Sequence, residues 1–146
     1  MQIPKKSQAK KGLGKGRSSK NMQKIILDAN AILRYVLEDT GEQFEAVEAI
    51  MINSQVLILP EVIAEVIYVL TKYYKIHRKE AAEAVLQFLL DAGCYSRVLI
   101  GSVGKFGNSN FDFVDCLLYE YSKNSGHKVF TFDKKLLKLI EDEGVK

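Results

Sequence analysis

Two aspartates in this sequence stand directly after short apolar runs that are typical of buried strands. Asp28 follows residues 24–27, and Asp133 follows residues 128–132. In open parallel sheets, ligands bind outside the carboxyl ends of the strands, where loops and helix N-termini meet. We therefore expect both carboxylates to face the same rim of a sheet.

Three further acids lie in stretches that are predicted to be helical. Asp112 and Asp115 are three residues apart at a helix start, so they share one face near the positive end of the helix dipole. Asp112 is the better candidate for helix capping. Asp115, between Val114 and other apolar residues, is costly to bury without a partner. Glu65 lies in a helix that is apolar around much of its circumference, although a position at the margin of the apolar arc is the alternative.

Several carboxylates on one rim repel one another and take up protons unless a cation compensates their charge. A set of oxygen ligands without Cys or His favours a hard ion, Mg²⁺ or Mn²⁺. Such an ion suits phosphodiester hydrolysis, because it polarises the phosphate, activates a water and stabilises charge on the leaving oxygen. The acids therefore indicate metal-dependent hydrolysis of a phosphodiester.

The cysteines and histidines do not offer a competing site. Cys94 and Cys116 are too few and too far apart for a disulfide framework or a CxxC zinc site, so we predict free, buried thiols. His77 and His127 lack the spacing of zinc ligands and are predicted to be ordinary helix-end or turn residues. We assign none of the four a function.

The net charge of +3 conceals an uneven distribution along the chain. Seven basic residues and no acid precede Met22, which leaves 14 basic against 18 acidic residues in the rest. Residues 1–21 hold few apolar side chains, so we predict a disordered basic tail before one domain of residues 22–146. No apolar stretch is long enough to cross a bilayer, which predicts a soluble, cytoplasmic protein.

Short apolar runs alternate with amphipathic stretches along this domain, a pattern typical of a parallel sheet covered by helices. The predicted strands are 24–27, 56–59, 97–100 and 128–132. The predicted helices are 30–37, one after Gly41, 60–74, 78–91, 111–123 and 134–141, with a loop over 101–110. We expect a three-layer α/β/α sandwich around a central parallel sheet of four to five strands.

Four ordered motifs in residues 22–141 resemble the PIN-domain nucleases, and in particular the VapC-type toxins of toxin–antitoxin pairs. The motifs are Leu-Asp28-Ala-Asn-Ala-Ile-Leu, Pro60 followed by Glu65, Asp-Phe-Val-Asp115-Cys-Leu-Leu and Thr-Phe-Asp133-Lys-Lys-Leu. The chain departs from that family in its basic tail and in its end at Lys146, which leaves little room for an extra terminal strand.

The resemblance implies that Asp28, Glu65, Asp115 and Asp133 form an acidic quartet. This quartet would hold Mg²⁺ or Mn²⁺ for endonucleolytic cleavage of RNA. Asn30 and Thr131 would support it, with helix capping by Asn30 and an ordinary strand position for Thr131 as the alternatives. Asp112 would be an auxiliary acid. The resemblance also implies a homodimer inhibited by a small antitoxin protein.

Three other functions compete with a ribonuclease toxin. A housekeeping RNA-processing nuclease would use the same residues, and a non-catalytic PIN-like module would bind RNA or protein without cutting. A phosphate-transfer domain of the haloacid dehalogenase or response-regulator type also places acids at strand ends. Its motifs fit poorly, because Asp28 is followed by Ala-Asn-Ala rather than by a second aspartate two residues later.

Overall fold

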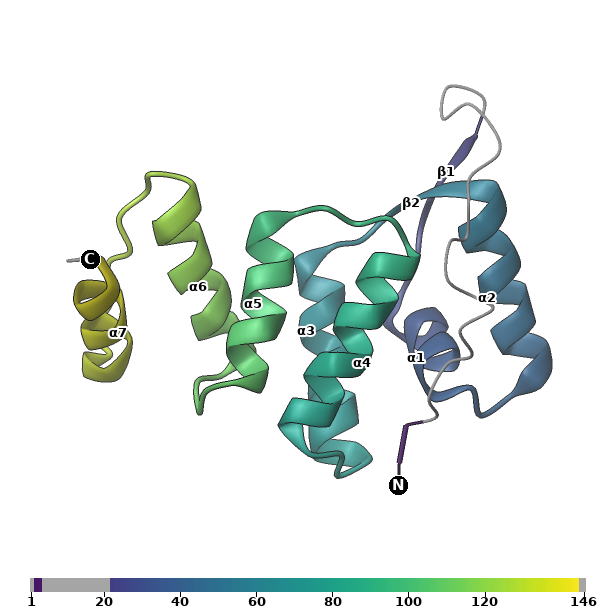
Figure 1. The fold of residues 1–146 in the computed structure, drawn as a ribbon, viewed down its shortest axis with the longest axis horizontal. Coiled ribbons are helices and arrows are strands. Elements are labelled where there is room, and N and C mark those ends of the chain that lie inside the picture. The colour runs from purple at the N-terminus through teal and green to yellow at the C-terminus, as the bar shows by residue number, and fades with distance from the viewer. Residues whose placement is uncertain (1, 4–21, 145–146) are drawn as a thin grey trace.

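The computed structural model describes residues 2–3 and 22–144, in which helices predominate (Figure 1). In chain order the elements are β1 (Gln23–Ile26), α1 (Ala29–Leu37), α2 (Gly41–Asn53), β2 (Ser54–Leu57), α3 (Pro60–Tyr68), the π-helical turn η3 (Val69–Tyr73), α4 (Arg78–Asp91), α5 (Arg97–Gly107), α6 (Phe113–Asn124) and α7 (Lys134–Gly144). No helix within these described residues is long and apolar enough to cross a membrane.

The two strands form a parallel pair at one end of the molecule. Gln23 lies opposite Ser54 and Ile26 opposite Leu57. Parallel strands require a crossover connection, and here α1 and α2 supply it. The predicted parallel pairing of the first two strands is therefore confirmed.

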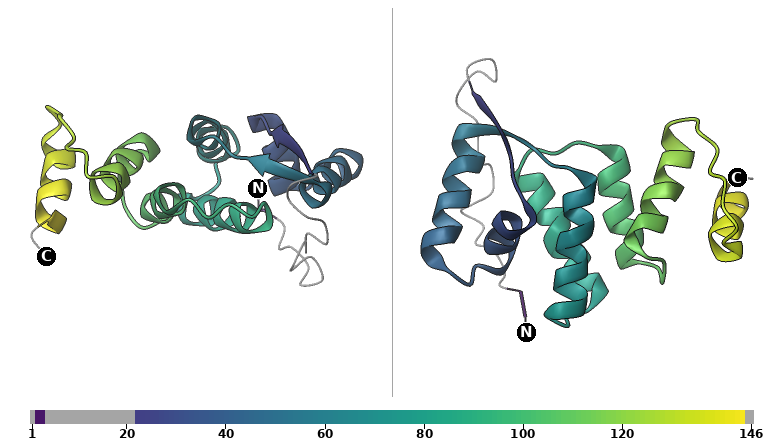
Figure 2. Two further views of the ribbon diagram at one scale, coloured as in Figure 1. Left: turned by 90° about the horizontal axis from the view of Figure 1, so that it is seen from above. Right: turned by 180° about the vertical axis from the view of Figure 1, so that it is seen from behind.

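The remaining helices lie side by side in a row that leads away from the sheet (Figures 1 and 2). Helix α4 packs against α5, α5 against α6, and α6 against α7. The strands and α7 are at opposite ends of this row in every view. The predicted three-layer sandwich is not seen in the described residues, because the sheet holds two strands instead of four or five.

Tyr35 stands at the centre of the core between the crossover helices and α4. Its ring stacks on Phe44 at a centroid distance of 5.1 Å and meets the ring of Phe88 edge-on at 5.7 Å. Its hydroxyl donates a hydrogen bond to Asp91 Oδ2 at 2.7 Å. Apolar packing and one polar contact thus fix α1 against α4.

The predicted strand over residues 97–100 is wrong, because this segment is the first turn of α5. Ser96 caps the helix by accepting a hydrogen bond from the backbone N–H of Leu99 at 3.2 Å. Leu99, Val103 and Phe106 are buried at helical spacing, which outweighs the short β-branched run that suggested a strand. The predicted loop over residues 101–110 is wrong for the same reason, since the helix continues to Gly107.

The predicted strand over residues 128–132 is not part of the sheet either. These residues adopt no regular secondary structure and lie between α6 and α7. Phe130 and Phe132 are 87% and 90% exposed, and their rings contact each other at 5.3 Å. The strand-forming pattern is present, but no strand of the part of the chain that the structure describes lies beside this segment.

The other helices agree with the sequence pattern. The helix predicted over residues 78–91 is confirmed at both ends, and those at 30–37, 60–74, 111–123 and 134–141 are confirmed within a few residues. The long third helix ends in the π-helical turn η3, which the periodicity did not indicate.

The predicted tail of residues 1–21 lies outside the described residues except at Gln2 and Ile3. Ile3 is partly buried against the core, and its backbone N–H donates a hydrogen bond to Glu80 at 3.1 Å. Both cysteines are free thiols, as predicted, with Cys116 buried and Cys94 partly exposed.

Candidate nuclease site

Asp28 lies at the carboxyl end of β1 and is the N-cap of α1. Its Oδ1 accepts a hydrogen bond from the backbone N–H of Ala31 at 2.8 Å. The side chain is otherwise exposed. Asn30, which also had capping as an alternative, is an exposed residue inside the helix, so capping falls to Asp28.

Asp115 lies in the first turn of α6, half-buried and close to two other acids. Burial raises the pKa of its carboxyl, and the negative charges of Asp112 and Asp133 raise that pKa further. Asp112 occupies the N-cap position, as predicted, but its side chain makes no capping hydrogen bond. Three of the candidate acids therefore share one electrostatic environment near the start of α6.

Asp133 directly precedes α7 and is exposed. Its Oδ1 accepts hydrogen bonds from the backbone N–H groups of Lys135, at 2.9 Å, and Leu136, at 3.1 Å. Thr131 Oγ1 in turn accepts from the backbone N–H of Asp133 at 3.0 Å. Thr131 thus fixes the backbone that carries Asp133 and is more than an ordinary strand residue.

Glu65 projects from α3 and is exposed, whereas its neighbours Ile63, Val66 and Ile67 are buried. The helix is apolar on its packed side, and Glu65 lies outside that arc. Its carboxylate is therefore available from solvent rather than buried within the core.

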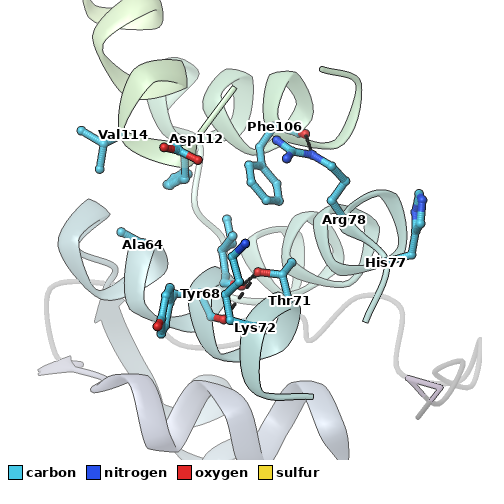
Figure 3. Close-up of a pocket in the computed structure, with 11 residues that line it drawn as sticks. Ala64, Tyr68, Thr71, Lys72, His77, Arg78, Phe106, Asp112 and Val114 are labelled. Atoms are coloured by element: carbon cyan, nitrogen blue, oxygen red, sulfur yellow. Dashed lines mark hydrogen bonds between the residues drawn. The ribbon is translucent and has the colours of Figure 1, made fainter. Parts of the chain in front are cut away.

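A cavity of about 590 Å³ opens between α3, η3 and α6, and it includes Asp112 (Figure 3). Ala64, Tyr68 and Val114 supply apolar surface, and Lys72 lies at its base. The remaining lining residues are Ile67, Thr71, His77, Arg78, Phe106 and Phe113. The cavity thus places one candidate acid beside apolar walls and two cations, Lys72 and Arg78.

Arg78 serves the structure of this cavity. Its Nε donates to the carbonyl of Phe106 at 2.9 Å, its Nη2 donates to the carbonyl of Phe111, and its guanidinium covers the Phe106 ring at 3.9 Å. His77 caps α4 and accepts from the backbone N–H of Lys79, which confirms its prediction as a helix-end residue. Lys72 is exposed and is the cation best placed to meet a ligand.

A family model for the PIN domain matches residues 25–141 of this chain. The chain belongs to the PIN-domain family. No curated protein and no solved structure matches it. PIN domains are generally metal-dependent nucleases that act on nucleic acids, so nuclease activity is the general expectation for this chain.

The arrangement of the acids does not by itself provide a metal site of the kind that PIN domains use. Within the described residues, no three Asp, Glu, His or Cys side chains lie close enough to hold a metal ion. The oxygen-only donors fit a hard cation chemically. The placement of these donors does not fit a shared cation. Residues 128–132 lie outside the sheet, so Asp133 does not join Asp28 at the rim of the sheet.

Sequence reasoning missed the cavity, whereas the family resemblance did group Asp115 with Asp133. The strong apolar character of residues 60–74 was a usable signal for the cavity, because a helix that is apolar on most sides packs against more than one neighbour. The helical row in which α7 packs on α6 had no such signal, because it depends on the path of residues 125–133.

Proposed function

We propose that this chain is a Mg²⁺- or Mn²⁺-dependent endoribonuclease that hydrolyses RNA phosphodiester bonds. The observation that carries the proposal is the PIN match over residues 25–141, because this range contains all four acids of the predicted quartet. Asp28, Glu65, Asp115 and Asp133 are the proposed catalytic and metal-holding residues.

The surroundings of Asp115 support this assignment. A half-buried carboxylate that faces two further acids is stabilised by a positive charge. Asp112 adds to the negative potential, and Thr131 holds the backbone of Asp133. We propose positioning or auxiliary roles for Asp112, Asn30 and Thr131.

Within this function we propose that the protein is a cytoplasmic, homodimeric toxin inhibited by a small antitoxin protein. The VapC-like motifs around Asp28, Asp115 and Asp133 support this role. Induced expression in a bacterial host should stop growth and translation, whereas the Asp115→Asn variant at equal abundance should not. Unharmed growth with the quartet intact would instead favour a housekeeping RNA-processing nuclease.

The decisive test of the chemistry is cleavage of total RNA by the purified chain in Mg²⁺, Mn²⁺ or EDTA. We expect cleavage with either metal, its loss in EDTA, and a loss of at least about 100-fold in Asp28→Asn and Asp115→Asn variants that fold normally. Glu83→Gln is the matched control, because Glu83 is an exposed acid on α4 outside the proposed site. Cleavage that persists in both aspartate variants would refute the assignment.

A non-catalytic RNA- or protein-binding PIN module is the second candidate function. The absence of a group of three metal ligands within the described residues favours it. Tight RNA binding that is independent of metal and leads to no cleavage would support this module and reject the nuclease.

A further inference from the structure

We infer that the cavity between α3, η3 and α6 binds a guanine nucleotide of single-stranded RNA. The inference rests on the proposed nuclease function, which it deepens by assigning a subsite for one nucleotide of the substrate. The cavity offers this nucleotide a stacking ring, a hydrogen-bond acceptor and a cation.

The cavity has the size and composition of a site for one small molecule. Its volume of about 590 Å³ lies within the range of pockets that enclose a small organic ligand. It opens between two walls that contact each other, α3 with η3 on one side and α6 on the other (Figure 3). More than half of its lining side chains are apolar or aromatic, which favours a flat ring over a free phosphate.

Tyr68 is the stacking ring. Its side chain lines the cavity and is 64% exposed, so the ring is accessible from the cavity and from solvent. In sites for single-stranded nucleic acid, bases of every kind stack on aromatic side chains. Tyr68 therefore supplies affinity for a base without selecting which base.

Asp112 is the acceptor that selects the base. It lies on the α6 wall, across the cavity from Tyr68, and its carboxylate makes no capping hydrogen bond to the helix backbone (Figure 3). Bases of single-stranded RNA are recognised on their Watson–Crick edges. Guanine alone has two adjacent N–H donors on that edge, and a carboxylate accepts both at once. The other three bases place an acceptor beside their donor, which a carboxylate repels.

Lys72 is the cation. It lies at the base of the cavity and is exposed, so its ammonium group can pair with the phosphate of the nucleotide. Arg78 also lines the cavity, but its guanidinium already donates to the carbonyls of Phe106 and Phe111. The phosphate contact therefore falls to Lys72.

The π-helical turn η3 is an independent indication that the cavity is used. Thr71 and Lys72 both belong to this turn and both line the cavity. The hydroxyl of Thr71 donates to the carbonyl of Ile67 at 2.8 Å, which fixes the turn. Helical turns of this type are rare and occur frequently at functional sites.

The cavity also lies next to two of the proposed catalytic acids. Asp115 follows Asp112 by three residues on α6, and Glu65 precedes Tyr68 by three residues on α3. Residues at this spacing are neighbours on a helix surface. A nucleotide in the cavity would therefore adjoin the phosphodiester that these acids would cleave, which predicts guanine at one fixed position beside the cut.

The binding test is calorimetry of the full chain in Mg²⁺ with guanosine or adenosine monophosphate, and with ribose 5-phosphate as the control for the phosphate alone. We expect the guanine nucleotide to bind at least about 5-fold more tightly than the adenine nucleotide, as a bidentate contact to a base does. Ribose 5-phosphate should bind more weakly than either. Equal affinities for the two nucleotides, or no binding of the guanine nucleotide at millimolar concentration, would overturn the inference.

Variants separate stacking from selection. Tyr68→Ala should weaken binding of the guanine nucleotide by about 5- to 100-fold, whereas Tyr68→Phe should retain it. Tyr73→Ala is the matched control, because Tyr73 is a 75% exposed tyrosine of η3 that does not line the cavity. Asp112→Asn should remove the preference for guanine and keep the helix, since Asn is as favourable as Asp at an N-cap. Full affinity in Tyr68→Ala, or an unchanged preference in Asp112→Asn, would contradict the assignment.

The ends that the chain leaves on total RNA test the subsite on the substrate. We expect guanine to be enriched at one position beside the cut, and the enrichment to disappear in Tyr68→Ala. Cleavage without base preference would overturn the RNA subsite, and selective binding would then belong to the free nucleotide. Selective binding by a chain that cleaves no RNA would instead refute the nuclease and leave the guanine site standing.

Discussion

Tyr35 shows how one polar group is accommodated within an apolar core. Its side chain is fully buried, and its hydroxyl donates to Asp91, which also accepts from Gln87 at 2.9 Å. A buried hydroxyl without a partner is costly, so this bond makes burial of the ring favourable.

We therefore expect Tyr35→Phe to lower the free energy of unfolding by about 1–2 kcal/mol at pH 7. Urea unfolding measures the change. Tyr95→Phe is the control, because Tyr95 is exposed and its substitution should leave the unfolding midpoint unchanged. Equal stability of Tyr35→Phe and the wild type would mean that the bond contributes nothing net.

The contribution of Tyr35 should also depend on pH. Burial, followed by the hydrogen bond and negative charge of Asp91, raises the pKa of the Tyr35 hydroxyl well above its usual value. Below about pH 10 the hydroxyl is protonated in both states, so its contribution to stability is complete. Above that pH the unfolded chain loses the proton first, and the free energy of unfolding falls. Unfolding curves from pH 8 to 11 should show the stability gap to Tyr35→Phe narrowing above about pH 10.

At the residue scale, the sequence predicted Asp28 after its strand, Asp112 at a helix start and His77 at a helix end. It also singled out Asp115, which does lie beside other acids. It did not predict that Asp28 and Asp133 would stand apart, since that depends on whether residues 128–132 enter the sheet.

At the element scale, α5 is shaped by its glycines. A Cβ on Gly107 would lie 2.6 Å from the Cβ of Ala82 on α4, which is far inside a normal contact distance. A Cβ on Gly104 would meet no atom within 4 Å. The close approach of α4 and α5 thus depends on Gly107 and does not depend on Gly104.

Gly107→Ala should therefore destabilise the protein by about 1–3 kcal/mol, as overpacking does. Gly104→Ala should stabilise it by about 0.5–1 kcal/mol, because glycine is unfavourable within a helix. Thermal unfolding measures both changes. Ala82→Gly added to Gly107→Ala should recover part of the loss, and a purely additive double variant would contradict the proposed clash.

The glycines of α5 also explain why the sequence pattern predicted the wrong secondary structure for α5 and the correct bounds for α4. Helix α4 has a capping residue, a regular apolar face and a terminal glycine at Gly93, so its bounds could be read directly. In α5, Gly101, Gly104 and Gly107 resembled loop residues, although they lie within a helix that packs on both α4 and α6. Tertiary packing, which the local pattern does not contain, decided the outcome.

At the scale of the whole molecule, charge is divided between a basic N-terminal segment and an acidic remainder. An acidic domain repels RNA, so the basic residues before Met22 should carry much of the affinity for the phosphate backbone. Two internal cations contribute less, because Arg34 pairs with Asp39 at 2.6 Å and Lys105 covers the Tyr119 ring.

Replacing the seven basic residues of this segment by Gln should weaken RNA binding and make it less dependent on salt. Fluorescence anisotropy at about 50 to 200 mM salt measures the slope, whose magnitude should fall by roughly 0.7 for each phosphate of single-stranded RNA that the segment neutralises. The variant retains Ile3 and its hydrogen bond to Glu80, so thermal stability serves as the control. An unchanged salt slope would assign RNA binding to the domain alone.

Charge, helix content and family motifs were thus accessible from the sequence at this scale. The row of helices and the separation of α7 from the sheet could not be predicted from the sequence. Periodicity does not encode which strand a segment will pair with.

The row of helices has a consequence for the order in which the chain can fold while it is synthesised. Ile26 leaves the ribosome about a hundred residues before Lys128, which corresponds to roughly 5–20 s at ordinary rates of translation. During that interval β1 and β2 can already pair, before α7 has been made. Each later helix of the row then finds the helix it packs against already present, so the row can be assembled in the order in which the chain is made.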